Sequence, residues 1–584
     1  MNDRLSRLFP PQVWLKRYRR TTLIQDAIAA VLMTILVIPQ SLAYAMLAGL
    51  PPETGLYASI LPVIGYALFA SSHTMAVGPV ALIALMSATT VAPLSNGDPA
   101  VALGTSLTLA LLCGLYLFAM GIARLGFIAN FISHPVISGF ISGSAVLIIL
   151  SQLGTLLAIP ASGANLPDIM GSILTHLERF NALTLLIGVA ALIMLLAGRR
   201  HTQPLLIRLG LGESAAGLLQ RLVPMVAVLV TTVATASAGL GDAGVAVVGV
   251  LPQGLPGLTL PSVNLAMLET LAVPAFLISL VIFVESASIA HRMAARRGER
   301  IDPDQELMGL GAANVLTAVS GGFAVAGGFS RTVVNDQAGA QTQVAGVLTA
   351  VGIGLVTVFF TDLFHYLPKA TLAAIIIAAA VTLIDTRSAR DTWRYSRQDG
   401  LALLATFLLT VFAGVIPGIL TGVALSLLLY LYRTSKPHIA VVGRLPGTEH
   451  FRNEQRYAVE TNQQLIILRV DEALYFANAR YLEDRISEAL RDHPAVTDCI
   501  LMCSGVNMID ASALETLEAI NTRLDGAGVR LHLSEVKGPV MDRLETTPFM
   551  RHLSGRVFLS TFDAWQSLNT ISPDTTAANN SCFL

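Results

Sequence analysis

The side chains best suited to chemistry lie in a glycine-rich stretch, residues 320–340, between long apolar runs. Four glycines precede Arg331 within eleven residues, which disfavours a continuous helix. We expect a short extended segment followed by a new helix that begins near Ser330. The first turn of a helix has unpaired N–H groups and a partial positive charge, and Arg331 adds a full charge. These residue types together predict an anion-binding site.

The cost of placing Arg331 in a membrane supports a functional role for it. A guanidinium at the bilayer centre costs roughly 2.5–3.5 kcal/mol on insertion scales. Non-helical backbone at that depth is tolerated only where protein or a water-filled cavity satisfies it. Backbone amides, the Ser330 hydroxyl and the guanidinium could coordinate an oxyanion there. The alternative is a structural role, in which Arg331 snorkels or holds a loop carbonyl.

Glu285 is a second titratable group within an apolar run, the stretch from Leu280 to Ala287. Its charge should depend on burial, on a nearby guanidinium and on whether an anion is bound. A proton-coupling residue must behave in this way. The alternative is a permanent ion pair between Glu285 and Arg331 that shapes the cavity.

Two segments nearer the N-terminus have similar features. Pro39 interrupts the first apolar span, near residues 23–46, and Gln40 and Tyr44 follow it. This span is either a kinked helix that satisfies its polar groups internally or a helix whose polar face meets the substrate. Gly78 and Pro79 predict that another short helix begins at Pro79.

The spacing of these features indicates two related halves. Pro79 and Arg331 are 252 residues apart, and Gln40 and Glu285 are 245 residues apart. Internal repeats with interrupted helices in corresponding positions are typical of secondary transporters. We therefore expect each half to contain one polar span followed by one half-helix.

The composition requires a membrane protein with several spans. Of 584 residues, 54% are hydrophobic and only 13% are charged. The formal net charge of −1 gives no indication of a nucleic-acid partner. The N-terminus is basic up to Arg20 and resembles no cleavable signal peptide. The four cysteines show no disulfide framework, and a reduced cytoplasmic setting is expected for Cys499 and Cys503, which share one predicted strand of the C-terminal domain.

We predict fourteen spans, seven in each half. They lie near 23–46, 54–70, 79–92, 100–124, 130–157, 181–198 and 222–238, then 268–291, 305–322, 331–342, 343–361, 367–384, 399–414 and 416–433. This count puts the arginine clusters at 199–221, 292–300 and 387–397 inside, and it leaves the loops at 93–99 and 239–264, which contain no Lys or Arg, outside. Because seven is odd, the two halves must be inverted relative to one another.

The composition changes to that of a soluble domain after Arg433. Strand-like segments at 464–470 and 498–503 alternate with helical patterns at 478–490 and 511–524, which indicates βαβ units. We expect six segments: a cytoplasmic N-terminal segment 1–22, repeats at 23–238 and 265–434, the outer loop 239–264, an α/β domain 438–570 and a disordered tail 571–584.

Motifs along nearly the whole chain resemble those of the SulP family of sulfate permeases and related anion transporters. They are Pro52, Gly55-Leu56-Tyr57, Pro62, Tyr66, Gly78-Pro79, Glu306, Gly309, Asn314, Phe329-Ser330-Arg331, Leu367-Pro368-Lys369-Ala370 and Leu383-Ile384-Asp385. Residues 475–479 and 509–512 resemble the C-terminal STAS domain of that family.

The resemblance implies an α-helical protein with a seven-plus-seven inverted repeat, divided into core and gate domains, that forms a homodimer in the bacterial inner membrane with both termini cytoplasmic. It implies an anion site between the starts of the third and tenth spans. The residues carried over by motif are Gln40, Tyr44, Gly78, Pro79, Val80, Phe329, Ser330 and Arg331. Val80 departs from some animal members, which have an aromatic residue there.

The function that follows from the resemblance is proton-coupled sulfate uptake by elevator-like alternating access, with Glu285 as the proton-coupling residue. Bicarbonate and dicarboxylates remain open as substrates, and an anion channel or a nucleobase permease is the more distant alternative. No cofactor, metal site or enzymatic activity is indicated. Ser512 matches the phosphorylated position of soluble STAS regulators, but it also fits a helix N-cap region after Asp510.

Overall fold

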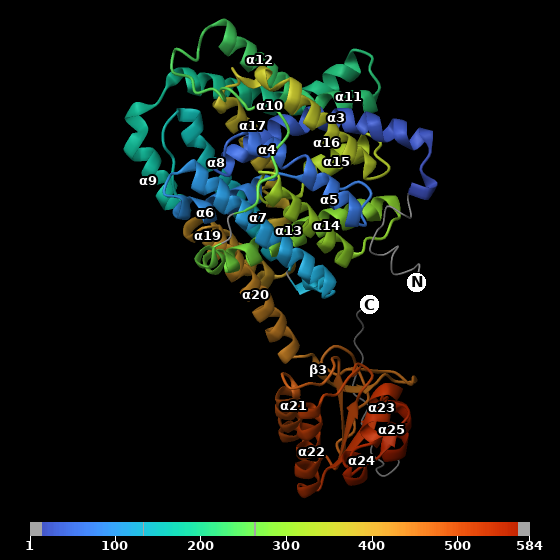
Figure 1. Cartoon of the computed structure of the whole chain (residues 1–584). Coiled ribbons are helices and arrows are strands. Elements are labelled where there is room, and N and C mark those ends of the chain that lie inside the picture. Colours follow the sequence, from blue (N-terminus) through green and yellow to red (C-terminus); the bar gives the residue numbers. More distant parts are fainter. Residues whose placement is uncertain (1–14, 132, 262–263, 570–584) are drawn as a thin grey trace. The chain divides into compact units, whose positions relative to one another are not determined.

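The computed structural model describes residues 15–131, 133–261 and 264–569. The chain separates into two compact units, Met1–Ser426 and Leu427–Leu584 (Figure 1). The expected disordered tail and most of the expected N-terminal segment lie outside the described residues.

The first unit consists of helices, and a helix occupies each of the fourteen predicted spans. In the first half these are α3 (Arg20–Leu47), α4 (Glu53–Tyr57) with α5 (Leu61–Phe69), α6 (Ala81–Ser95), α7 (Pro99–Ile122), α8 (His134–Leu157), α10 (Ala182–Arg208) and α12 (Val223–Ser237). In the second half they are α13 (Leu265–Arg297), α14 (Pro303–Val319), α15 (Phe329–Gln337), α16 (Val344–Phe359), α17 (Lys369–Ala380), α19 (Arg397–Ala413) and α20 (Val415–Ser435). Seven of the described helices are long and apolar enough to cross a membrane by themselves.

The helices pack in two groups that each draw on both halves of the sequence. In one group α14 packs against α5 and α7, α7 packs against α6 and α13, and α16 packs against α3 and α5. In the other group α8 packs against α17 and α19, and α10 packs against α12 and α17. The first group corresponds to the expected core domain and the second to the expected gate domain.

Glycines allow the closest helix pair of the core domain, α7 and α14, to approach. A Cβ atom on Gly114 would lie 2.6 Å from the backbone N of Val315, and one on Gly311 would lie 2.7 Å from the backbone N of Phe118. Small residues at such contacts let helix backbones pack directly in a membrane, where dispersion contacts replace the hydrophobic effect. Any side chain at either glycine would push the two helices apart.

Several local expectations were wrong. Pro39 does not break the first span into two helices, since α3 runs from Arg20 to Leu47 with Pro39 inside it. The second span is broken into α4 and α5. In the described part of the first unit, three helices were not predicted: α9 (Leu166–His176), α11 (Glu213–Gln220) and α18 (Thr386–Tyr395). These three are short, and α18 is strongly polar, so a search for long apolar runs passes over them.

The second unit contains a six-stranded sheet with the order β4-β3-β5-β6-β7-β8. The strands are β3 (Ile439–Arg444), β4 (Phe451–Asn453), β5 (Leu465–Val470), β6 (Asp498–Met502), β7 (Arg530–Ser534) and β8 (Val557–Phe558). Strands β5 to β8 are parallel, and β3 is antiparallel to both of its neighbours. The predicted βαβ pattern is therefore confirmed.

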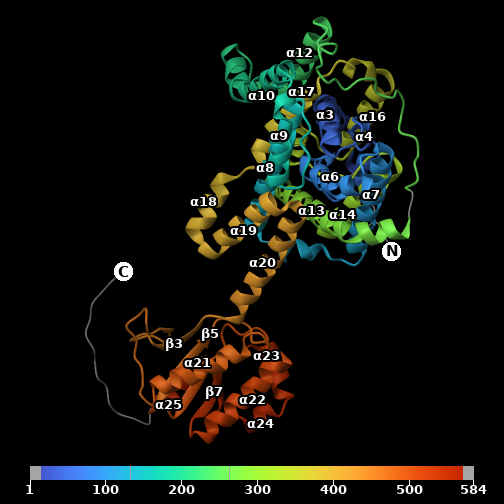
Figure 2. The same cartoon turned by 90° about the vertical axis from the view of Figure 1, so that its left-hand side faces the viewer.

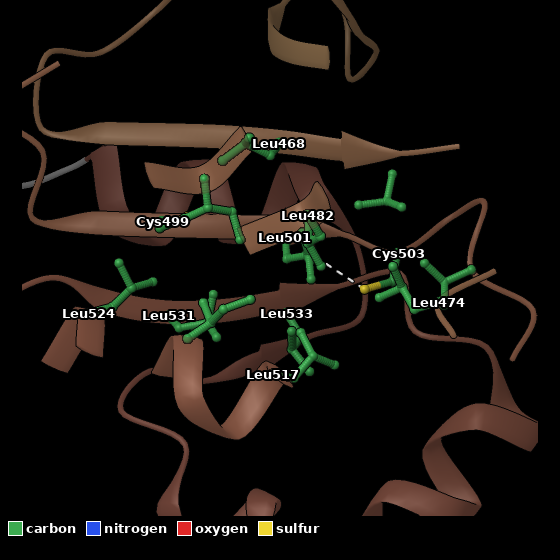
Figure 3. Close-up of a cluster of buried hydrophobic side chains, with 14 of the residues drawn as sticks. Leu468, Leu474, Leu482, Cys499, Leu501, Cys503, Leu517, Leu524, Leu531 and Leu533 are labelled. Carbon is green, nitrogen blue, oxygen red and sulfur yellow. Dashed lines mark hydrogen bonds between the residues drawn. The ribbon is translucent and has the colours of Figure 1, made fainter. Parts of the chain in front are cut away.

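Helices cover both faces of this sheet. They are α21 (Ala479–Asp492), α22 (Ala511–Gly526), α23 (Gly538–Glu545), α24 (Phe549–His552) and α25 (Thr561–Asn569). Alternate strand residues point to opposite faces of the sheet. On one face, Leu468 and Leu501 belong to the cluster under α21 and α22. On the other face, Ile467 and Ile500 pack with Trp565 of α25. Figure 3 shows the first cluster, and Figure 2 shows the strands among the helices.

A buried polar pair ties β6 to β7 in this domain. The Nε2 atom of His532 lies 2.9 Å from Oδ1 of Asp498, and its Nδ1 atom accepts a hydrogen bond from the backbone N of Arg556 at 3.0 Å. Burial lowers the pKa of His532. Burial alone would raise the pKa of Asp498, but hydrogen bonds from His532, Arg530 and Thr497 outweigh it and hold that pKa below its usual value. In the neutral imidazole, both ring nitrogens have a hydrogen-bond partner.

Candidate functional site

The two glycine-rich breaks, one from each half of the sequence, lie side by side. Strand β1 (Val77–Gly78) pairs antiparallel with strand β2 (Ala326–Gly327). Helix α6 begins three residues after β1, and α15 begins two residues after β2. Because the strands are antiparallel, the two helices leave the pair in opposite directions with their N-termini toward it. The predicted break before Arg331 is confirmed.

Protein groups satisfy the extended backbone of this strand pair. The side chain of Asn314 accepts from the backbone N of Val325 at 2.9 Å and donates to its carbonyl at 3.0 Å. The hydroxyl of Ser286 accepts from the backbone N of Gly327 at 2.9 Å. Across the pair, the hydroxyl of Thr332 accepts from the backbone N of Ala76 at 3.1 Å. Non-helical backbone inside a membrane bundle needs such partners.

The guanidinium of Arg331 fills the space that two glycines leave. Arg331 is only 3% exposed. A Cβ atom on Gly78 would lie 2.6 Å from its Nη1 atom, and one on Gly328 would lie 3.1 Å from its Nε atom. The Nη2 atom is buried and has no hydrogen-bond partner. Since buried polar groups are normally hydrogen-bonded, this free donor makes the space beside Arg331 a candidate place for a ligand.

Tyr44 and Glu285 complete the buried part of the site. Tyr44 is 7% exposed and lies within electrostatic reach of both Arg331 and Glu285. The Oε2 atom of Glu285 is buried and has no hydrogen-bond partner. In the described parts of the chain no ion pair joins Glu285 to Arg331, so the permanent pair considered from the sequence is not formed. Arg292, which follows on the same helix, lies within electrostatic reach of Glu285.

The other residues expected at the site divide into buried and exposed ones. Pro79 and Val80 are buried at the start of α6. Gln40 is partly buried and precedes Tyr44 by four residues on α3, which places both on one helix face. Phe329 is 45% exposed, and Ser330 is also exposed, at the start of α15. The chain thus passes from two exposed residues, Phe329 and Ser330, to the buried Arg331.

Two further residues contact or support the segments that form the site, and the sequence analysis gave neither of them a role there. The guanidinium of Arg292 lies 5.0 Å from the ring centroid of Phe329, a cation–π contact at the exposed edge. Arg292 follows Glu285 by seven residues, a spacing that puts both on one face of α13 and could have indicated it.

The second such residue, Glu306 of α14, was noted only as part of a motif. Its carboxylate, fully buried, accepts from the hydroxyl of Tyr66 at 2.5 Å and from the backbone N atoms of Ser71 and Ser72 at 3.0 and 2.8 Å. It also accepts from the Ser71 hydroxyl at 2.7 Å. Glu306 thereby fixes the turn from α5 into β1.

Ser512 lies in the second unit, where it is the exposed second residue of α22. The cap of α22 is Asp510, whose carboxylate accepts from the backbone N atoms of Ala513 at 2.8 Å and Phe476 at 3.0 Å. Over the described ranges, no group of three or more His, Cys, Asp and Glu side chains is placed to hold a metal ion.

Comparison with known families gives the same division of the chain. Residues 23–406 match the model of the Sulfate permease family, and residues 456–564 match the model of the STAS domain. The chain belongs to the sulfate permease family. This permease is 34% identical over 549 residues to "Sulfate transporter 4.1, chloroplastic" of Arabidopsis thaliana, an alignment that covers 91% of the chain and 78% of the relative. It is 33% identical over 543 residues to a probable sulfate transporter of Mycobacterium tuberculosis, covering 93% and 94%.

Solved structures show the fold of the permease. Murine Solute Carrier 26 family member A9, an anion transporter solved in the inward-facing state, matches with a TM-score of 0.88 at 22% identity, covering 98% of this chain and 95% of that one. The transmembrane domain of a cyanobacterium bicarbonate transporter matches with a TM-score of 0.59 at 21% identity, covering 70% and 98%. The expected fold class, an α-helical membrane domain of two inverted repeats with an α/β STAS domain, is confirmed.

Proposed function

We propose that this permease is a secondary active transporter of inorganic anions, with sulfate as its leading substrate. The observation that carries the proposal is the antiparallel pairing of β1 and β2, which holds two helix N-termini beside a buried Arg331 with an unpaired donor. The names of the relatives, sulfate transporters of a plant and a bacterium, support the choice of substrate.

A tetrahedral oxyanion suits the donors at this site. Backbone N–H groups in the first turns of α6 and α15 supply donors with fixed directions and a partial positive charge. The Ser330 hydroxyl and the free Nη2 atom of Arg331 add two more, and the guanidinium supplies the full charge. We assign Gln40 and Tyr44 to the opposite wall, because they lie on one face of α3 and Tyr44 is within electrostatic reach of Arg331.

Coupling to protons is assigned to Glu285. Its buried Oε2 atom has no hydrogen-bond partner among the described residues, so that oxygen is available to take up a proton. A proton taken up with the anion would partly neutralise the loaded site and lower the cost of moving it through the membrane. The core domain, which contains the site, would move against the gate domain in an elevator-like alternation of access, within a homodimer whose termini are cytoplasmic.

Uptake of radiolabelled sulfate into proteoliposomes tests this function. We expect uptake to be faster with an inward proton gradient and to be reduced more by unlabelled sulfate than by fumarate or bicarbonate. Stronger inhibition by fumarate or bicarbonate would reassign the substrate within the same mechanism. No saturable uptake of any of the three anions would overturn the proposal.

The variant Glu285→Gln tests the proton role. It should transport sulfate with little dependence on external pH, whereas Glu269→Gln, an exposed acid on the same helix, should keep the normal dependence. An unchanged pH dependence in Glu285→Gln would remove Glu285 from the coupling mechanism.

A further inference from the structure

Helix α18 presents a stripe of unpaired arginines. Arg387, Arg390 and Arg394 are exposed, and at about 100° per residue they fall within about 60° of one another around the helix. Throughout the part of the chain that the structure describes, no carboxylate forms an ion pair with any of the three. None of the residues of α18 is buried. The stripe is therefore free to meet a partner of opposite charge.

The position of α18 in the chain restricts that partner. Helix α17 ends at Ala380, and α19 begins at Arg397, with one residue between it and the end of α18. Both neighbours are spans of the membrane domain, so α18 lies where spans leave the bilayer. The backbone N of Asp385 donates to the Ser142 hydroxyl of α8 at 3.4 Å, which joins the start of α18 to the gate domain. Figure 2 shows α18 at the margin of the helical unit, outside α19.

Two aromatic side chains beside the stripe also suit a membrane surface. Trp393 is 45% exposed, and one edge of its ring lies against Gly400 of α19, where an added Cβ atom would lie 2.5 Å from Cε3. Tyr395 is 91% exposed. Tryptophan and tyrosine gather at the level of lipid headgroups, where one part of the ring is apolar and another meets water. A short helix with arginines and aromatic rings is typical of an interfacial segment.

We propose that α18 is a binding site for the headgroups of anionic phospholipids. The arginine pattern of the loops predicts that this helix is on the cytoplasmic side, where the leaflet carries negative lipids. Each arginine near such a surface contributes about fivefold in affinity, and the exposed Asp391 at the edge of the stripe opposes them, so we expect a net preference between about fivefold and 100-fold. Lipid held there would anchor the gate domain, because α18 is fixed to α8 and α19. The inference does not depend on which anion is transported.

Quenching of Trp393 fluorescence by brominated lipids tests the site in the full-length protein. The protein is reconstituted in mixtures of brominated phosphatidylglycerol or brominated phosphatidylcholine with their unlabelled counterparts. The signal of the Trp393→Phe variant is subtracted, so that only Trp393 is followed. The concentration dependence gives the affinity of phosphatidylglycerol relative to phosphatidylcholine beside α18. We expect a relative affinity of at least about fivefold for the native protein, decreasing as salt is added.

Two triple variants separate the arginine stripe from a general effect of charge. Arg387→Gln, Arg390→Gln and Arg394→Gln together should bring the relative affinity close to one, whereas the three corresponding changes to Lys should keep most of it. The control replaces three exposed arginines of the second unit, Arg480, Arg491 and Arg551, by Gln and should change nothing.

Three outcomes would overturn the proposal. The first is equal affinity for the two lipids in the native protein. The second is an unchanged preference in the Gln triple variant. The third is the absence of quenching by either lipid, which would show that a protein surface, such as a second copy of the chain, covers α18.

Discussion

The contact between Gly78 and Arg331 provides the sharpest test of the proposed site. In the variant Gly78→Ala, the new Cβ atom would lie 2.6 Å from the Nη1 atom of Arg331, and ordinary contact begins near 3.4 Å. The guanidinium must therefore move by about 0.8 Å, the difference between those distances. The end of the guanidinium is flexible and can move by that distance. Gly78 also has a φ of 157°, which an alanine rarely adopts, so the variant strains the backbone of β1 as well as changing the direction of the donors.

The size of the effect follows from the hydrogen bonds at stake. A hydrogen bond to a charged group contributes about 1.5–3 kcal/mol net, which corresponds to roughly 10- to 150-fold in affinity. We expect sulfate binding by Gly78→Ala to weaken within that range. Gly328→Ala, whose Cβ atom would lie 3.1 Å from the Nε atom, requires a smaller shift and should weaken binding by less than about tenfold.

The assay compares sulfate dissociation constants of purified protein with KM for uptake into proteoliposomes. Gly171→Ala is the matched control, since nothing lies within 4 Å of its added Cβ atom. Thermal unfolding shows whether each variant is folded. A folded Gly78→Ala protein with the native dissociation constant would refute the inference that this glycine positions the anion-binding guanidinium.

Three further predictions concern stability and reactivity. Burial lowers the pKa of His532, so as pH falls the unfolded chain takes up a proton at this residue before the folded chain does. We therefore expect the melting temperature of the second unit, followed by Trp565 fluorescence, to fall as pH decreases below about 6.5. A His532→Gln variant that kept this pH dependence would contradict the assignment. Burial raises the pKa of the Cys499 and Cys503 thiols to about 12, so both should react with iodoacetamide far more slowly in the native than in the denatured protein, and equal rates by mass spectrometry would disprove their burial. Glu306→Gln leaves a neutral acceptor for four donors and should lower the free energy of unfolding by roughly 2–3 kcal/mol. An unfolding temperature equal to that of the native protein would exclude this cost.

Much of the architecture follows from local properties of the sequence. Long apolar runs predicted the membrane spans, because the thickness of the bilayer fixes how many apolar residues a helix needs to cross it. The glycines before Arg331 gave the break in the tenth span, because backbone preference acts over a few residues. The alternation of strand and helix patterns after Arg433 gave the α/β domain for the same reason. The equal spacing of the two breaks indicated the repeat.

The partners of the buried polar groups were decided only by tertiary structure. The sequence suggested a Glu285–Arg331 ion pair as one alternative, yet the two side chains stay unpaired and Arg331 packs against Gly78, more than 250 residues away in the chain. Pro39 was expected to interrupt the first span, but it lies inside the continuous helix α3. Local preference describes a residue's own backbone, whereas a contact between distant residues depends on how the helices pack. The sequence therefore determined where the helices are interrupted. Only the tertiary structure decided that the two interrupted segments pair with each other beside Arg331.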